Sequence, residues 1–565
     1  MNTFGFTVVI GKNAYKSNFG ASSIIDREII SVYNHMVIKF EQDKIFEEDD
    51  DFIVVLDGVI LNKINLDKRH DWYQTIISLY IEKGDTFFND FRGSFSGILH
   101  DKKKRRTIIF SDHIGTKFLY YSLLDNGTII CSSMIRYVYD YFKMNHITYS
   151  LSIESAYLLL TYGYMLGNRT LCNKIFKITP GCYLVIENGK IEEKRYCLLS
   201  NEPDYSLSER DAIELYDSEF RRAVKLQFEK DREYNYRHLV ALSGGLDSRM
   251  TTWVAHELGY TEQLNYTFSQ SDYWDEIVPK QIARDIKHEW IFKALDNGLW
   301  LYDIDEITNL TGGNVLYYGL AHNNSLLKNL DISRYGIIHS GQLGDVVMGT
   351  FYDAPNPNLK FSIGDGAYSK KYVNKTNNVI LEEYDNQEIS KFYHRGFSGT
   401  NNGQLVDMLY SETYSPFMDW DLMNNILTVP VKYRFNHQLY KKWILSKYPK
   451  AAKYVWEKMQ ASVKMPIFAI FNKEIPIQQI PNRIMWKLHL KKSGIDSSKH
   501  MNPIGYYLSA NIDLRKSLME NFDKLDLVPD NALKSILIGI ASGENSMEKI
   551  QAISLLNAIG RFFKN

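Results

Sequence analysis

The stretch Val240–Arg249 constrains the fold of this chain more than any other, because an apolar run breaks there into Ser-Gly-Gly-Leu-Asp-Ser. The apolar residues 238–242 predict a short buried strand that ends at a turn. Behind the turn, apolar side chains recur at helical spacing, and Gly259 stands where a helix would end. The members of this apolar face are Met250, Trp253, Val254 and Leu258. We therefore expect a strand, a glycine turn and a helix.

Such a turn has the chemistry of a phosphate-binding loop. Gly244 and Gly245 allow a close approach to an anion, and the N–H groups and dipole at a helix N-terminus favour negative charge. Asp247 would repel a phosphate unless a divalent cation lay between them, so we interpret it as a Mg²⁺ ligand. The loop lacks the lysine of a Walker A sequence, and an ordinary glycine turn remains an alternative for the motif alone. The predicted phosphate-binding residues of the loop are Leu242, Ser243, Gly244, Gly245, Asp247 and Ser248.

Strand and helix patterns alternate after this loop. Strands are expected at 264–268, 288–292 and 335–339, with helices at 277–287 and 321–330 between them. Regular alternation predicts a doubly wound parallel sheet. Ligands of such sheets bind at the carboxyl ends of the strands, so the first loop and the stretch from Ser340 to Asp345 should meet there.

The whole chain allows more than one domain, because 565 residues exceed the usual size of a single core. A formal charge of −1 gives no overall case for nucleic acid or membrane partners, and we expect neither. The four cysteines form no C-x-x-C pair, and residues 1–10 lack the features of a signal peptide. These observations favour a protein of the cytoplasm.

Residues 1–200 read as strands separated by turn signals such as Asp57-Gly58 and Asn188-Gly189, the second of which predicts a hairpin. One helix is expected at 72–83, and an amphipathic helix at 205–230 leads into the phosphate loop. Residues 353–402 lack a clear period and are interpreted as an insertion or lid. The end of the chain is predicted to be helical, with a core-facing helix at 550–563.

The loop resembles the Ser-Gly-Gly-x-Asp-Ser loop of the N-type ATP pyrophosphatases, which cleave ATP between its α and β phosphates and leave AMP on the substrate. The N-terminal half resembles the glutaminase domain of asparagine synthetases, with G-x-F and R-D-x-x-G-x-x-P-L-Y-Y patterns. The matching positions are Gly93, Phe95, Asp101, Asp112, Gly115, Leu119, Tyr120 and Tyr121.

This resemblance implies an α/β protein of two parts. Residues 1–204 would form an Ntn-hydrolase-like sandwich, and residues 205–565 a doubly wound sheet of the N-type ATP pyrophosphatase (adenine nucleotide α-hydrolase-like) fold with a helical end. The resemblance assigns ATP and pyrophosphate as ligands to the phosphate-binding residues of the loop. It further implies that Mg-ATP adenylates a carboxylate and releases pyrophosphate, after which an amine or ammonia displaces AMP.

The departures from the family concern its glutaminase chemistry. The family has a nucleophilic cysteine after the initiator Met, and this chain has Asn2, whose amide cannot act as that nucleophile. The oxyanion Asn-Gly element reads Asp57-Gly58, and the Arg before Asp112 is Ser111. Because residues 4–6 fall where the first strand should be, we expect no cysteine upstream. Glutaminase activity is therefore predicted to be absent.

The resemblance also assigns roles around the second signature, S-G-x-G-x-D-E. Ser340 and Gly341 would contact the nucleotide, and Asp345 would be the second magnesium ligand; an acidic turn is the alternative for this stretch alone. Lys458, in a segment like the family's W-R-x-K, is the candidate catalytic lysine, with Lys464 in reserve. Gln342 cannot serve as a base. We therefore hypothesise that Glu412 does, and that Glu412→Gln abolishes amide formation while ATP still binds.

The amine donor stays open. Free ammonia, ammonia from a separate subunit, and an amine on the substrate itself, as β-lactam synthetases and lasso-peptide cyclases use, all fit. The acyl substrate would be a small-molecule or peptide carboxylate, and such folds often form homodimers. The alternative function is a catalytically silent ATP-binding scaffold, although paired acids in a phosphate site count against it.

Overall fold

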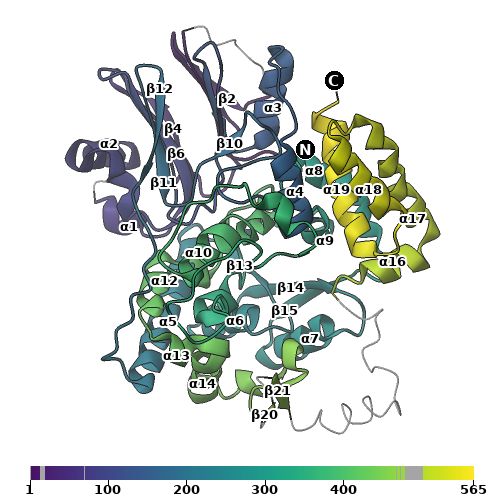
Figure 1. Cartoon of the computed structure of the whole chain (residues 1–565). Helices are drawn as coiled ribbons and strands as arrows, with labels where there is room; N and C mark the ends of the chain where they lie inside the picture. Colours follow the sequence, from purple (N-terminus) through teal and green to yellow (C-terminus); the bar gives the residue numbers. More distant parts are fainter. Residues whose placement is uncertain are drawn as a thin grey trace.

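The computed structural model describes residues 2–12, 19–68, 70–465, 467–470, 473–476 and 501–564. Antiparallel sheets from the N-terminal half form the upper part of Figure 1, and a parallel sheet flanked by helices forms the lower part. The C-terminal helices stand beside both parts. In the described part of the chain, no helix has both the length and the apolar character needed to cross a membrane.

The N-terminal half is a sandwich of two antiparallel six-stranded sheets. The first has the order β10 (Phe176–Lys177), β8 (Tyr120–Leu123), β9 (Ile129–Ser132), β1 (Phe6–Ile10), β3 (Ile30–Asn34) and β2 (Ser23–Asp26). The second has the order β12 (Lys190–Arg195), β11 (Cys182–Glu187), β7 (Arg106–Ser111), β6 (Gly93–Asp101), β5 (Phe52–Ile60) and β4 (Ile45–Glu48). Apolar side chains of both sheets, such as Val8 and Val55, share one buried cluster, which confirms the predicted sandwich.

Helices cover the outer faces of this sandwich. Helix α2 (Trp72–Lys83), with the bounds expected from the sequence, packs on the second sheet. Helices α3 (Ile135–Met144) and α4 (Ile153–Tyr162) cover the first sheet and were not predicted. All ten residues of α4 except Ile153 and Glu154 are buried, so its sequence shows no polar face from which a helical period could be read.

The C-terminal half contains the predicted parallel sheet, with five strands in the order β15-β14-β13-β16-β17. Their bounds are β13 (Arg237–Ala241), β14 (Gln263–Ser269), β15 (Glu289–Ala294), β16 (Tyr335–His339) and β17 (Thr413–Tyr414). Strand β17 was not predicted. The chain moves outward from β13 through β14 to β15 and then returns to β16 on the other side of β13. This reversal places the carboxyl ends of β13 and β16 at a topological switch point, where ligands of such sheets bind.

Helices lie on both faces of this sheet, as a doubly wound fold requires. One face carries α5 (Glu209–Glu233), α6 (Asp247–Glu257) and α7 (Trp274–Ile286), and the other carries α8 (Ile304–Thr311) and α9 (Tyr318–Leu327). The predicted helices 277–287 and 321–330 thus begin three residues earlier than expected. Ser208 and Asp211 form a capping box at the start of α5. The boundary predicted at 204/205 stays a prediction; it falls between the end of β12 and the start of α5.

The remaining elements complete the C-terminal half. The helical end confirmed by the structure comprises α16 (Ile504–Ala510), α17 (Ile512–Met519), α18 (Asn531–Ser542) and α19 (Ser546–Phe562). Helix α19 packs against α4, so the end of the chain shares a core with the N-terminal half (Figure 1). Further short elements include β18 (Val455–Trp456), β19 (Ala461–Ser462), β20 (Ile467–Ile470), β21 (Lys473–Pro476), α10 (Gln387–Lys391), a π-helix (Phe392–Phe397), α11 (Gln404–Asp407), α12 (Trp420–Leu427), α13 (Val431–Arg434), α14 (Gln438–Lys447) and η10 (Glu457–Met459), while α1 (Lys63–Leu66) lies in the N-terminal half.

Candidate functional site

The predicted phosphate loop joins β13 to α6 at the switch point of the sheet. Its ends are anchored by the buried side chains of Leu242 and Leu246. The N–H of Ser243 donates to Oγ of Ser248 at 2.9 Å, and the N–H of Gly245 donates to Oγ of Ser243 at 3.2 Å. The two serines therefore fix the loop from within, in addition to offering hydroxyls to a ligand.

Gly244 is tied to the protein through both of its backbone polar groups. Its N–H donates to Oδ1 of Asp275 at 2.7 Å, and its carbonyl accepts from Nη2 of Arg249 at 3.0 Å and from the N–H of Glu457 at 3.1 Å. A Cβ at this position would lie 3.0 Å from the carbonyl oxygen of Trp274, which leaves little room for any residue but glycine. Both backbone polar groups of Gly244 are therefore engaged in the structure.

Arg249 joins the loop to the segment that leads to Lys458. Its fully buried guanidinium donates to the carbonyls of Gly244 and Val455, at 3.0 and 2.6 Å, and to that of Tyr454 at 3.3 Å. Burial lowers the pKa of Arg249 to about 10. Because these acceptors are all backbone carbonyls, the arginine fixes the relative positions of two chain segments. Sequence reasoning missed this role, although the apolar helix face around Arg249 signals its burial.

The two predicted magnesium ligands meet beside the loop. A Cβ on Gly344 would lie 2.4 Å from Cγ of Asp247, and one on Gly341 would lie 2.3 Å from the N atom of Ser248. These glycines let the stretch from Ser340 to Asp345 close against the start of α6. Burial, with a further contribution from the charge of Asp345, raises the pKa of Asp247 to about 8. The structure thus brings Asp247, Ser248, Gly341 and Asp345 into one site.

Ser340 follows β16 and lies on the same edge, where its carbonyl accepts from Oγ1 of Thr251 at 3.2 Å. Gln342 next to it is turned toward the end of the 353–402 region, since its side-chain amide donates to the carbonyl of Thr400. Oγ of Ser415, just after β17, donates to the carbonyl of Gln342 at 2.9 Å. The second signature is therefore held between β16 and β17.

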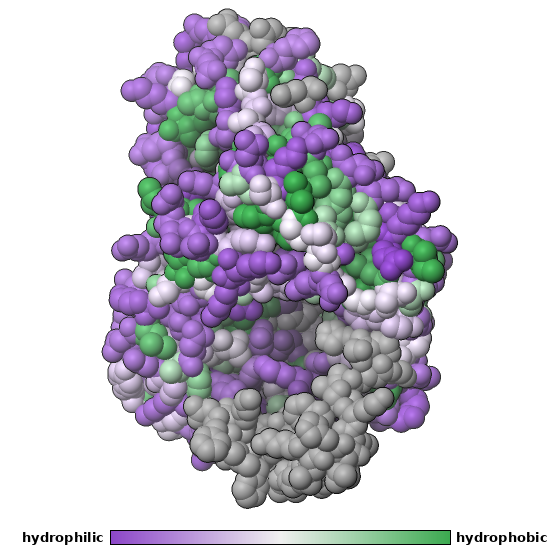
Figure 2. Space-filling model, turned by 45° about the vertical axis from the view of Figure 1, so that its right-hand side comes forward, coloured by the Kyte–Doolittle hydropathy of each residue, from purple (hydrophilic) through white to green (hydrophobic). Residues whose placement is uncertain are grey.

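Lys458 is exposed on η10. It directly follows Glu457, whose backbone N–H donates to the carbonyl of Gly244. Its Nζ lies 5.8 Å from the centroid of the Trp456 ring, and its charge acts on Asp247, so it lies on the side of the acid pair. Lys464 is exposed beyond β19. The assignment of the catalytic lysine to Lys458 and not to Lys464 stays a prediction. The position of Lys458 near the acid pair supports this assignment. Figure 2 shows a hollow with a largely hydrophilic floor in the lower half of the molecule, at the height of α6 and β14 in Figure 1.

Glu412 lies in a different environment from the one expected for a base. Oε1 lies 2.8 Å from Nζ of Lys44, and Oε2 lies 2.9 Å from Nζ of Lys117. The same lysines contact Asp57, at 3.4 and 2.6 Å. We call Lys44, Asp57, Lys117 and Glu412 the interdomain ion cluster, because it joins the N-terminal sandwich to the residue before β17. Both oxygens of Glu412 are engaged there, which argues against its hypothesised catalytic role.

The interdomain ion cluster is almost completely buried, with side chains at most 7% exposed. Burial opposes ionisation, but Lys117 and Lys44 hold the pKa of Asp57 below its ordinary value. Burial likewise opposes the charge of Lys117, and the carboxylates of Asp57 and Glu412 raise its pKa. The charged forms of Asp57 and Lys117 are therefore each stabilised by oppositely charged neighbours in the cluster.

The region expected to correspond to a glutaminase site carries no thiol. The side-chain amide of Asn2 donates to the carbonyl of Leu409 at 3.0 Å. Cε of Lys117 lies 3.0 Å from where a Cβ on Gly58 would be, so the lysine fills the space beside the Asp57-Gly58 turn. The four cysteines are unpaired, and burial raises the pKa of each.

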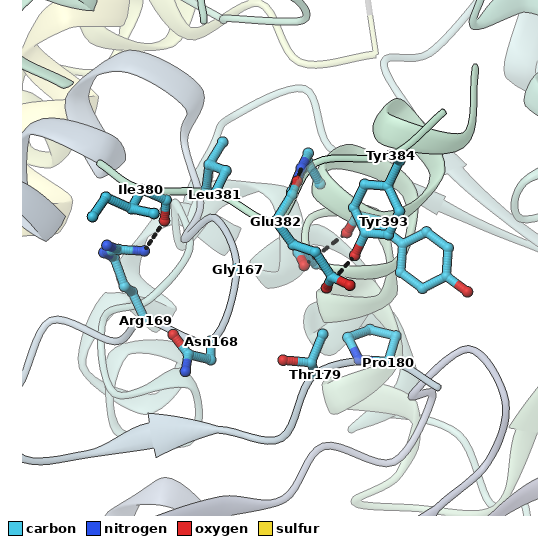
Figure 3. Close-up of a pocket in the computed structure, with 12 residues that line it drawn as sticks. Gly167, Asn168, Arg169, Thr179, Pro180, Ile380, Leu381, Glu382, Tyr384 and Tyr393 are labelled. Atoms are coloured by element: carbon cyan, nitrogen blue, oxygen red, sulfur yellow. Dashed lines mark hydrogen bonds between the residues drawn. The ribbon is translucent and has the colours of Figure 1, made fainter. Parts of the chain in front are cut away.

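A separate cavity of about 170 Å³ lies where the end of the sandwich meets the 353–402 region (Figure 3). Arg169 closes one side by donating to the carbonyl of Ile380 at 3.0 Å. On the other side, Glu382 accepts from the hydroxyl of Tyr384 at 2.8 Å and pairs with Arg195. The lining of this cavity includes none of the residues around Gly244.

Residues 40–197 match the sequence model of a glutamine amidotransferase domain. A putative glutamine-hydrolysing asparagine synthetase of Methanocaldococcus jannaschii is 25% identical over 293 residues, which are 46% of this chain and 55% of that protein. The amidase chry2 of Gibberella zeae is 25% identical over 189 residues, 33% of this chain and 26% of that protein. The chain thus spans about half the length of the first relative and about a quarter of the second.

Among solved structures, glutamine phosphoribosylpyrophosphate amidotransferase of B. subtilis, complexed with ADP and GMP, covers 75% of this chain and 87% of its own. Its sequence identity is 9% and its TM-score is 0.23, a score at which the likeness supports no further statement.

Proposed function

We propose that this chain, a member of the asparagine-synthetase-like superfamily, is an ATP-dependent amide ligase that forms an acyl adenylate. A carboxylate is a poor acyl donor, because its leaving group would be oxide, and adenylation supplies a better one. The observation that carries the proposal is the approach of Asp247 and Asp345 beside a glycine loop at the switch point of the parallel sheet. Paired acids have no use in a phosphate site without a cation.

The donor set fits Mg²⁺. Asp247 and Asp345 offer hard carboxylate oxygens, and burial next to a second carboxylate raises the pKa of Asp247 to about 8. A cation would relieve this repulsion between like charges. Asp247 and Asp345 would hold Mg²⁺, which would supply positive charge to neutralise the leaving pyrophosphate.

The residues of the chain act on two successive displacements. In the first, a carboxylate oxygen attacks the α-phosphorus and the bond to pyrophosphate breaks, while the hydroxyls of Ser243 and Ser248 and the N-terminus of α6 donate to the leaving group. In the second, an amine attacks the acyl carbon, the carbon–nitrogen bond forms, the bond from the acyl carbon to AMP breaks, and the proton of the amine passes to water. Lys458 would stabilise the oxyanion of this second step.

The proposal includes the loss of glutaminase activity. The support is Asn2 at the position of the nucleophile and the buried interdomain ion cluster beside Gly58. The nitrogen would then reach the adenylate as free ammonia, as ammonia from another protein, or as an amine of the substrate. The acyl substrate would be a small-molecule or peptide carboxylate.

A pyrophosphate-release assay tests the proposal. The protein would be incubated with Mg-ATP and a panel of carboxylates, with and without ammonium, and the amide product would be identified by mass spectrometry. We expect carboxylate-dependent release that Asp247→Asn and Asp345→Asn each abolish. The matched control is Asp125→Asn, which removes one charge from a side chain that is 95% exposed. ATP binding without release for any carboxylate would instead favour a silent scaffold.

A further inference from the structure

Asp275 occupies the position of an anionic ligand at the phosphate loop. Its Oδ1 accepts the N–H of Gly244 at 2.7 Å, and it belongs to the first turn of α7, on the neighbouring crossover of the sheet. A carboxylate oxygen is an anionic acceptor of the same kind as a phosphate oxygen. The loop therefore already holds one anion of the protein itself at the backbone of its first glycine.

The surroundings of Asp275 do not compensate its charge. The side chain is buried, and no ion pair of Asp275 is found within the part of the chain that the structure describes. A second acid, Glu457, lies close by, because a Cβ on Gly244 would be 3.1 Å from Cβ of Glu457 and 3.2 Å from Oδ1 of Asp275. Burial, with Glu457 contributing in the same direction, raises the pKa of Asp275 to about 6. The hydrogen bond from the N–H of Gly244 thus holds the carboxylate of Asp275 where burial and Glu457 both disfavour its negative charge.

Pyrophosphate at this loop would meet two obstacles. It would need the N–H of Gly244, which Asp275 occupies, and it would approach a buried negative charge. Charge-assisted hydrogen bonds are also stronger than neutral ones, so a carboxylate competes better than an amide for the same donor.

We propose that Asp275 is a positioning residue that stands in for pyrophosphate in the ligand-free loop and yields the N–H of Gly244 when the nucleotide binds. This inference rests on the proposed function of the loop as a pyrophosphate site. Asp275 then keeps the backbone of Gly244 in its ligand-binding conformation between turnovers. It also lowers the affinity of the loop for the leaving pyrophosphate. The competition would favour release of a product that the paired acids and their cation would otherwise retain.

Calorimetric titration of the full chain with Mg-pyrophosphate, Mg-ATP and AMP tests the inference. Asp275→Asn keeps an oxygen that can accept from Gly244 and removes the charge. We expect it to bind Mg-pyrophosphate about tenfold more tightly, which corresponds to about 1.4 kcal/mol. Binding of AMP, which lacks the β and γ phosphates, should change less than twofold. A purely structural role would not produce a gain in affinity confined to pyrophosphate-bearing ligands.

Glu276→Gln is the matched control, because it removes the adjacent charge in the same helical turn, where Glu276 accepts from the N–H of Asp272 and not from the loop. Its affinities should equal those of the unaltered chain. Asp275→Ala guards against a poorly folded Asn variant, and it should also bind Mg-pyrophosphate more tightly.

Unchanged affinity in both Asp275 variants would overturn the inference while leaving the proposed function intact. Weaker binding that is restored by more Mg²⁺ would also overturn it, because Asp275 would then be a cation ligand. If the unaltered chain binds neither Mg-ATP nor Mg-pyrophosphate, the proposed function fails first, and the inference with it.

Discussion

Oε2 of Glu412 lies 2.9 Å from Nζ of Lys117, a contact that joins the edge of the parallel sheet to the N-terminal sandwich. The contact belongs to the interdomain ion cluster, in which two lysines face two acids out of reach of solvent. Buried pairs of this kind are costly to break, because the surviving partner keeps an uncompensated charge.

Lys117→Met should therefore lower the free energy of unfolding by about 3–5 kcal/mol, because Asp57 and Glu412 would face each other with one lysine fewer. Urea denaturation followed by circular dichroism measures the change. Lys103→Met is the control, since Lys103 and Asp51 form an exposed pair with side chains 75% and 40% accessible, and its midpoint should not move. Equal effects of the two substitutions would contradict a structural role of the cluster.

Glu412→Gln should affect stability more than catalysis. We expect amide formation per folded molecule to stay within about twofold, because an engaged carboxylate cannot take a proton from an amine, whereas the unfolding midpoint should fall. Activity and denaturation would be measured on the same preparation. Loss of amide formation at unchanged stability would restore the base role hypothesised from the sequence.

The interdomain ion cluster predicts a defined response to acid. The lysines hold the pKa of Asp57 below its ordinary value of 3.8, so its contribution to stability is complete above that value and is lost as the pH falls through the lower pKa of the folded state. Asp57→Asn should therefore be less stable at pH 7 and should lose less further stability between about pH 4 and pH 2. Thermal melts across this range measure the difference in slope.

Arg249→Lys should slow adenylation with little effect on nucleotide binding. An ammonium cannot span the carbonyls of Gly244 and Val455 as the guanidinium does, so the loop and the segment before Lys458 would shift relative to each other. We expect pyrophosphate release to fall about tenfold or more, since small displacements in an active site are costly, while the Kd for ATP changes less than threefold. Arg232→Lys, at a half-exposed arginine of α5, serves as the control.

The two candidate lysines can be separated by the step that each affects. Lys458→Ala should preserve carboxylate-dependent exchange between ATP and labelled pyrophosphate, because this exchange reports the first displacement, and should reduce amide formation about a hundredfold. Lys464→Ala should resemble the unaltered chain in both assays. The opposite pattern would transfer the role to Lys464.

Local sequence patterns were sufficient to predict those parts of the structure that depend on residues close together in the sequence. The alternation from 238 to 339 gave the parallel sheet, and the glycines around Asp247 gave the site at its edge. Asp275 is not among the site residues predicted from the sequence, since its contact with Gly244 depends on how α7 is set beside the loop. The partners of Glu412 could not be foreseen, because nothing near Lys44 or Lys117 in the sequence distinguishes them from other lysines.

Strand β17 is the last strand on its side of the sheet, and it is only two residues long. An open edge presents unpaired backbone groups to any other chain, and proteins shield such edges. Here the N-terminal sandwich covers this edge. Its strand β6 contacts β17, and its Lys117 forms an ion pair with Glu412, the residue before β17. The N-terminal half therefore covers the open sheet edge of the half that carries the glycine loop, and so protects that half against aggregation through this edge.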